Sequence, residues 1–274
     1  MTSSAPLAAV LQFPGSNCEH ETTEVLDLSG LKGRLYRWNQ WQELRDDAPD
    51  AVLLPGGFSY QDRVRAGAVA AKERIMDLVF QLASRGVPVL GICNGAQILV
   101  ETGLVPGDAQ GAVQASLAAN HIPGRSGYLS SWIFVKIEGN AAERCPWLGS
   151  LGEEPIPLPI AHAEGRFVLA EGAEGSSALS YCGYSGLKPR GYPENPNGSE
   201  RNMAGMMNRQ GNVLAMMPHP ERAFHMWQLP PGLPGEWGDR REKAAESGSL
   251  GIAPGPGSRF FRSLAVHFGL QQKV

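Results

Sequence analysis

Cys93 has the sequence surroundings of a cysteine nucleophile. It lies in the segment VLGICNGAQ, in which an apolar run leads through Gly-x-Cys-x-Gly into a predicted helix. This arrangement is the cysteine counterpart of the strand–turn–helix elbow that presents a nucleophilic serine. The glycines relieve crowding in the sharp turn, and the helix N-terminus favours the thiolate. The alternative is a buried core cysteine after a strand, and the motif alone does not decide between the two.

A cysteine nucleophile needs a base, and two H-x-E segments offer one. In His219-Pro220-Glu221 an extended chain would project the histidine and the glutamate to the same side, so that Glu221 holds one ring nitrogen while the other faces the thiol. Proline fixes φ and stiffens the pair. His162 and Glu164 repeat the spacing. A surface loop is the alternative for each segment, and spacing alone does not choose between them.

Two backbone N–H groups are candidates for stabilising an oxyanion. The first belongs to Asn94, directly after the cysteine. The second belongs to Gly57, because a Gly-Gly pair at a strand end can turn an N–H outward. An ordinary strand-to-helix turn is the alternative for any Gly-Gly pair.

The first hundred residues contain the elements that would position these groups. Short apolar runs alternate with helical spacing, which predicts a mostly parallel sheet flanked by helices, an α/β fold. Such sheets bind ligands at the carboxyl ends of their strands, where three Gly-rich turns occur. The predicted strands are Leu7–Phe13, Gly33–Trp38, Ala51–Leu54 and Val87–Ile92, and the predicted helices are Cys18–Leu28 and Val64–Ser84.

The second half is less regular, with strands that are partly antiparallel. Residues 192–199 form a turn-rich loop, and residues 228–258 are rich in Pro and Gly, charged and without an apolar period, which indicates a surface insertion. No linker divides the chain, so we predict one domain over residues 1–274 with an insertion at 228–258. The predicted elements are the strands Trp132–Ile137, Arg166–Leu169, Ala178–Tyr181 and Asn212–Met217, and the helix Arg259–Phe268.

Composition narrows the functional classes. The 274 residues carry a formal net charge of −3 and no long run of Lys or Arg, so neither nucleic acid nor a membrane surface is expected as a partner. The opening apolar run is too short to span a membrane, which favours the cytoplasm. No C-x-x-C pair or histidine cluster has metal-ligand spacing, so no metal is expected. Cys18 follows a strand in a Gly turn, but no base is paired with it in sequence.

Taken together, these segments resemble the class I (triad) glutamine amidotransferases, which have a Rossmann-like α/β fold. Within that class the chain is similar to the family of glutaminase subunits of phosphoribosylformylglycinamidine synthase, which act in purine biosynthesis. The resemblance extends over about residues 7–222. The segments that carry it are FPGSNC at 13–18, GGFSY at 56–60 with RAG at 65–67, GICNGAQ at 91–97, IAHAEGR at 160–166, NPNGS at 195–199 and MMPHPER at 216–222.

The resemblance implies a role for each matching position. It makes Cys93 the nucleophile that removes ammonia from glutamine through a thioester, His219 its base and Glu221 the group that orients the base. Gly57 and Asn94 would form the oxyanion hole. The positions it assigns to the glutamine pocket are Gln97, Ser131 and Trp132, the last two within the stretch 128–132.

The resemblance also implies partners. A synthetase subunit would receive the ammonia, and residues 162–166 would face that subunit or the ammonia exit. A small accessory subunit would complete the complex. No P-loop or dinucleotide motif is present, so no cofactor is expected in this chain, and ATP and Mg are expected on the synthetase.

Three departures affect the pocket edge and the partner surface. Residues 61–64 replace a smaller, more aromatic stretch of the family, residues 127–132 match loosely, and the 228–258 insertion is long. The alternatives are the glutaminase component of another ATP-dependent amidotransferase (for GMP, CTP or carbamoyl phosphate), a regulatory subunit with a silent triad, and an unrelated cysteine hydrolase.

Overall fold

The computed structural model describes residues 5–107 and 112–271 of the chain. The two ends of the predicted 1–274 domain therefore lie outside the described residues. The strands are β1 Leu7–Gln12, β2 Lys32–Arg37, β3 Ala51–Leu54, β4 Val89–Ile92, β5 Ala115–Ala119, β6 Leu129–Ile137, β7 Ile156–His162, β8 Glu164–Leu169, β9 Ser176–Cys182, β10 Met203–Met207 and β11 Val213–Met216. The α-helices are α1 Glu19–Leu28, α2 Trp41–Asp47, α3 Arg74–Ser84, α4 Asn94–Glu101, α5 Ala141–Arg144, α6 Glu236–Glu246 and α7 Ser258–His267.

One nine-stranded sheet organises the described residues, in the order β2-β1-β3-β4-β11-β10-β9-β6-β7. The first five strands pair in parallel, and the last four continue the sheet with antiparallel pairing. Strands β5 and β8 form a separate antiparallel pair. The predicted α/β fold with a largely parallel sheet is thereby confirmed, as is the partly antiparallel second half.

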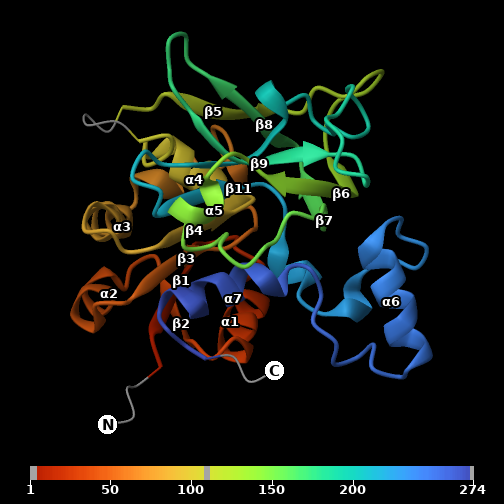
Figure 1. The fold of residues 1–274 in the computed structure, drawn as a ribbon. Coiled ribbons are helices and arrows are strands. Elements are labelled where there is room, and N and C mark those ends of the chain that lie inside the picture. Colours follow the sequence, from red (N-terminus) through yellow and green to blue (C-terminus); the bar gives the residue numbers. More distant parts are fainter. Residues whose placement is uncertain (1–4, 108–111, 272–274) are drawn as a thin grey trace.

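Helices cover the parallel strands on both sides, and this explains the uninterrupted apolar sequences of β3 and β4. Every residue of these two strands is buried. Figure 1 shows α1 and α7 beside β1 and β2, and α4 beside β4 and β11. Apolar residues recur along one face of α3, with Ile75, Val79 and Leu82 buried. The resulting core packs around the central strands of the sheet, and these strands hold the residues of the candidate site in position.

Several elements differ from the sequence prediction, which did not contain α2, α5, β5 or β10. The helix predicted over 64–84 begins only at Arg74, because Val64 and Gly67 have φ of 73° and 78°, which are left-handed values that a right-handed helix excludes. Strand β7 was not predicted, since Pro157 and Pro159 interrupt its pattern. It lies at the edge of the sheet, where a proline costs no ladder hydrogen bond on the open side.

The predicted insertion at 228–258 contains a helix of its own. Helix α6 lies apart from the sheet in Figure 1, and its Trp237 and Ala244 form a small apolar cluster with Met226 and Leu229. The guanidinium groups of Arg240 and Arg259 lie 4.5 Å and 4.8 Å from the centre of the Trp237 ring. The helix is polar on average, so its sequence lacks the apolar period by which a helix is recognised. No described helix is long and apolar enough to span a membrane.

Candidate active site

The strand order brings the three predicted chemical segments to one edge of the sheet. Strand β4 lies between β3 and β11, and all three are parallel. Gly57 follows β3, Cys93 follows β4 and His219 follows β11. Since the carboxyl ends of parallel strands meet at the same edge, residues more than a hundred positions apart become neighbours.

Cys93 occupies the strained turn that the sequence predicts. Its φ and ψ are 52° and −106°, an unusual conformation for a residue with a side chain, and α4 begins at the next residue. A Cβ on Gly95 would lie 1.9 Å from the Leu54 carbonyl oxygen, so only glycine allows α4 to approach β3 this closely. The Cys93 Sγ lies 3.6 Å from the Ala161 carbonyl oxygen, and the residue lines a small cavity.

His219 and Glu221 form a buried pair next to Cys93. The distance from His219 Nδ1 to Glu221 Oε1 is 2.5 Å, and both residues are 2% exposed or less. Burial lowers the pKa of His219, but the charges of Glu221 and Cys93 and the contact with Cys18 outweigh it, so the pKa lies well above its ordinary value. Because Nδ1 is committed to Glu221, Nε2 is left for the thiol side, and it has no hydrogen-bond partner among the described residues.

The segment after His219 is a turn and not the extended chain that we predicted. His219 itself is extended, but Pro220 starts a short 3-10 helix, Pro220–Ala223. The turn, which proline favours at its first position, folds Glu221 back under the imidazole. The expected pairing therefore occurs through a different backbone path.

Gly57 and Asn94 are both neighbours of the nucleophile. Gly57 lines the cavity with Cys93, and its φ of +147° together with a Cβ position 2.6 Å from Ser16 Cα excludes any side chain. Asn94 begins α4, where backbone N–H groups have no intrahelical acceptor. Its side chain accepts the Ser59 N–H at 3.1 Å and donates to Gln97 Oε1 at 2.9 Å, which ties the Gly-Gly loop to the helix.

Of the three residues predicted to bind glutamine, only Gln97 lines the cavity. Its Nε2 donates to the Glu164 carbonyl oxygen at 2.5 Å. Ser131 is exposed on β6, and Trp132 packs between the main core and the small cluster beneath α6. Neither residue lines the small cavity beside Cys93, and their part in binding glutamine stays a prediction.

Tyr128, which precedes that strand, is the aromatic residue of this stretch that faces the site. Its ring centre lies 6.4 Å from that of Phe58, a residue that lines the cavity. Burial, and the charges of Cys93 and Cys18, raise the pKa of Tyr128. The sequence pointed to residues 128–132, but the choice within that stretch needs the register of β6.

Cys18 is the site residue that sequence reasoning missed. No base is near it in the chain, yet α1, which begins after Cys18, packs against the turn Pro220–Ala223, and Cys18 thereby contacts His219. A Cβ on Gly56 would lie 2.6 Å from His219 Cε1 and 3.0 Å from Cys18 Sγ. Arg222 Nη2 donates to Cys18 Sγ at 3.0 Å. Burial raises the pKa of this thiol, whose backbone φ of −112° is ordinary.

The second H-x-E segment also lies at the cavity, but its members do not pair. His162 ends β7 and bonds through Nδ1 to Asn120 Oδ1 at 3.1 Å, whereas Glu164 accepts the Ala66 N–H at 3.2 Å. Burial lowers the pKa of His162 to about 3, with a further contribution from His219. His162 is therefore a neutral imidazole with no carboxylate behind it, unlike His219.

Among the described residues, one group of metal-ligating side chains comes together. One ligand atom each from Cys18, His219 and Glu221 lie within 4.8 Å of one another. His219 Nδ1 is already bonded to Glu221 Oε1, and the Arg222 guanidinium donates to Cys18 Sγ. The arrangement therefore fits the positioning of a base better than the binding of a metal.

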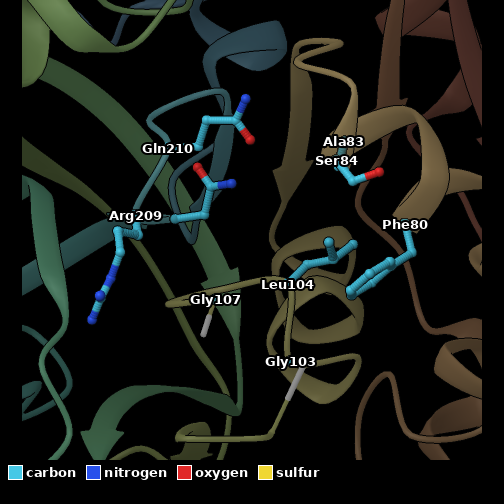
Figure 2. Close-up of a pocket in the computed structure, with 9 residues that line it drawn as sticks. Phe80, Ala83, Ser84, Gly103, Leu104, Gly107, Arg209 and Gln210 are labelled. Atoms are coloured by element: carbon cyan, nitrogen blue, oxygen red, sulfur yellow. The ribbon is translucent and has the colours of Figure 1, made fainter. Parts of the chain in front are cut away.

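A different cavity, of about 470 Å³, lies at the other end of the sheet. It is bounded by the end of α3, the segment after α4 and the turn before β11, as Figure 2 shows with Phe80, Leu104 and Arg209. Strands β4 and β11 begin at this cavity, whereas Cys93 and His219 follow their opposite ends. The cavity is therefore separate from the candidate active site. None of the predicted site residues lines it.

Comparison with known proteins agrees with this geometry. Residues 5–263 match the family described as the CobB/CobQ-like glutamine amidotransferase domain. The class of protein that the fold and the site define is therefore a glutamine amidotransferase.

Curated relatives narrow the class. The phosphoribosylformylglycinamidine synthase subunit PurQ of Methanothrix thermoacetophila is 44% identical over 245 residues, which are 83% of this chain and 91% of the relative. The PurQ subunit of Pyrococcus furiosus is 41% identical over 218 residues, 79% of this chain and 89% of the relative. The chain belongs to this PurQ family.

Solved structures give the same placement. The structure of PurLQS from Thermotoga maritima superposes with a TM-score of 0.71 and 29% identity, over 96% of this chain and 99% of the other. A glutamine amidotransferase from Methylobacillus flagellatus has a TM-score of 0.51 at 15% identity, over 99% of this chain and 98% of the other, and shows the fold alone.

Proposed function

We propose that this chain is the glutaminase component of phosphoribosylformylglycinamidine synthase, with Cys93, His219 and Glu221 as its catalytic triad. The observation that carries the proposal is the buried His219–Glu221 pair beside a cysteine in a strained elbow. Burial without this pairing would leave a neutral imidazole, which is the state of His162.

The reaction follows from the positions of these atoms. The Cys93 thiolate attacks the side-chain carboxamide carbon of glutamine, and the Gly57 and Asn94 N–H groups stabilise the oxyanion of the tetrahedral intermediate. His219, held protonated at Nε2 by the carboxylate behind it, gives its proton to the leaving nitrogen, and ammonia departs as the thioester forms. His219 then takes a proton from water, which attacks the thioester and releases glutamate and free Cys93.

The fixed orientation of His219 is the main contribution of the surrounding protein. Glu221 accepts Nδ1–H, and the His219 backbone N–H donates to the Pro159 carbonyl oxygen at 2.9 Å. These bonds leave Nε2 directed to the thiol side throughout both half-reactions. The same logic holds in other nucleophile–base–carboxylate sites, where the carboxylate selects the tautomer.

The partner is a synthetase subunit, which would receive the ammonia and bind ATP and Mg in the cytoplasm. Support comes from the PurLQS likeness and from the PurQ relatives. A small accessory subunit belongs to the same proposal.

Reconstitution with the synthetase tests the proposal. We expect Cys93→Ala to reduce glutamine-dependent synthesis by at least about 10³-fold, since the covalent path is lost, while ammonia-dependent synthesis remains. Cys182→Ala, at a buried thiol on β9, is the matched control and should retain both activities. Glutamine turnover that survives in Cys93→Ala would contradict the assignment.

A further inference from the structure

One wall of the cavity beside Cys93 offers only acceptors and negative charge. Asp62, His162 and Glu164 line the same cavity as the nucleophile, and we call these three residues the acceptor wall. Asp62 comes from the loop after β3, and the other two come from the β7–β8 connection. The triad chemistry uses none of them.

His162 contributes an unpartnered acceptor. Asn120 Nδ2 donates to the His162 carbonyl oxygen at 2.8 Å and to the Gly127 carbonyl oxygen at 3.2 Å, which fixes the orientation of the amide. Asn120 Oδ1 must then accept from His162 Nδ1–H, so the neutral ring has its lone pair on Nε2. His162 is only 2% exposed, so water does not reach this nitrogen freely. The atom nevertheless has no hydrogen-bond partner among the described residues. A buried acceptor of this kind requires a donor.

Each of the two carboxylates has a hydrogen-bond partner at the cavity. Asp62 Oδ1 lies 3.5 Å from Asn94 Nδ2, and Glu164 is anchored by the Ala66 N–H. Burial, and the charge of Glu164, raise the pKa of Asp62 to about 6. The arginines of the same loop have other partners, since Arg63 donates to Gln61 Oε1 at 3.3 Å and Arg65 pairs with Glu101 on α4.

The room for this wall is built into the backbone. A Cβ on Gly165 would lie 2.2 Å from His162 Cε1 and 2.7 Å from Nε2, so only glycine at that position admits the ring. Tyr60, Gln61 and Asp62 have φ of 54°, 61° and 53°, which are left-handed values. This run of three left-handed residues turns the chain so that Asp62 lines the cavity.

We propose that the acceptor wall binds the α-ammonium group of the substrate amino acid. This inference rests on the proposed function, because it takes glutamine as the substrate. An ammonium group has three N–H donors and a positive charge, which suits one imidazole nitrogen and two carboxylates. When the carboxamide of glutamine lies at Cys93, the α-ammonium group is the only positively charged group of the substrate, and it lies at the opposite end of the molecule.

The inference predicts selection for the ammonium group itself. In the complex with the synthetase, Asp62→Asn should lower kcat/KM for glutamine by about 10- to 100-fold, as expected for a charge-assisted hydrogen bond. Its kcat/KM for glutaramate, which is glutamine without the α-ammonium group, should change by less than about threefold. Glu164→Gln should also lower kcat/KM for glutamine and not for glutaramate, and this variant provides the test if Asp62→Asn does not fold. Glu43→Gln, an exposed carboxylate on α2, is the control.

Two outcomes would overturn the inference. One is an unchanged preference for glutamine over glutaramate in both carboxylate variants. The other is an equal loss with both substrates, which would mean that the carboxylates act on the leaving ammonia. The proposed function fails separately, if the unaltered complex does not hydrolyse glutamine or if Cys93→Ala still does.

Discussion

His219-Pro220-Glu221 and His162-Ala163-Glu164 share one spacing, and both histidines are buried near Cys93. His219 is paired with its own glutamate at 2.5 Å, and its pKa is raised. His162 is paired with an amide at 3.1 Å, and burial lowers its pKa to about 3. One segment therefore holds a proton at neutral pH, whereas the other holds a lone pair.

The cause of the difference is the backbone after each histidine. Pro220 opens a 3-10 turn that brings Glu221 under the ring. After His162 the chain enters β8, so Glu164 bonds to the Ala66 N–H. Identical residue spacing thus produces a base in one place and a neutral acceptor in the other, because the local turn chooses the partner.

The largest expected effect separates the two histidines. His219→Asn should reduce glutamine hydrolysis by at least about 10³-fold, because it removes both proton transfers. His162→Asn should reduce kcat/KM by only about tenfold, mainly through KM. Steady-state kinetics on the complex with the synthetase measure both. Comparable losses of kcat in the two variants would contradict the distinction.

Glu221 should affect kcat, unlike Glu164, which is proposed to act on substrate binding. Glu221→Gln keeps the shape but cannot hold the imidazolium, so kcat should fall by about 10²- to 10³-fold. Ammonia-dependent synthesis is the internal control. If Glu221→Gln alters KM alone, Glu221 does not orient the base.

Cys18 should have a smaller effect, because it contacts the base from outside the cavity. Cys18→Ser should lower kcat by about three- to tenfold and shift the pH profile of kcat, since Cys18 contributes to the raised pKa of His219. Cys182→Ser is the control. A loss as large as that in Cys93→Ala would make Cys18 a rival nucleophile.

The smallest effect is on stability in acid. The pKa of His162 is about 3 in the folded chain and about 6.5 when unfolded, so between these values the unfolded state binds the extra proton. Acidification through this range therefore destabilises the fold by up to about 1.4 kcal/mol per pH unit at this site. His162→Gln should lose less stability between pH 6.5 and 4.5 in denaturant titrations, and parallel curves would contradict the assignment. The raised pKa of His219 has the opposite sign, since its stabilisation is lost as pH rises.

The sequence was most informative where chemistry is local. The Cys93 elbow and the parallel strands are encoded within short segments, and glycines mark the sharp turns. The antiparallel half was harder, because β7 carries two prolines that only its edge position tolerates. α6 was missed because its apolar contacts are few and belong to a small separate cluster.

Contacts between distant segments could not be predicted. Cys18 and His219 are 201 positions apart, and they meet because α1 packs against the turn that follows His219. That Tyr128 contacts Phe58 at the cavity depends on where β6 begins, which the sequence pattern does not fix. Asp62 faces the cavity because of a run of left-handed residues that carries no glycine.

The most direct test of the account is to identify the thiol that reacts with a glutamine-analogue electrophile. The complex with the synthetase would be incubated with a chloroketone analogue of glutamine, and the modified peptide would be identified by mass spectrometry. The account predicts one adduct, on Cys93, which excess glutamine prevents and which forms far more slowly in His219→Asn. An adduct on Cys18, or none in a complex that hydrolyses glutamine, would contradict it.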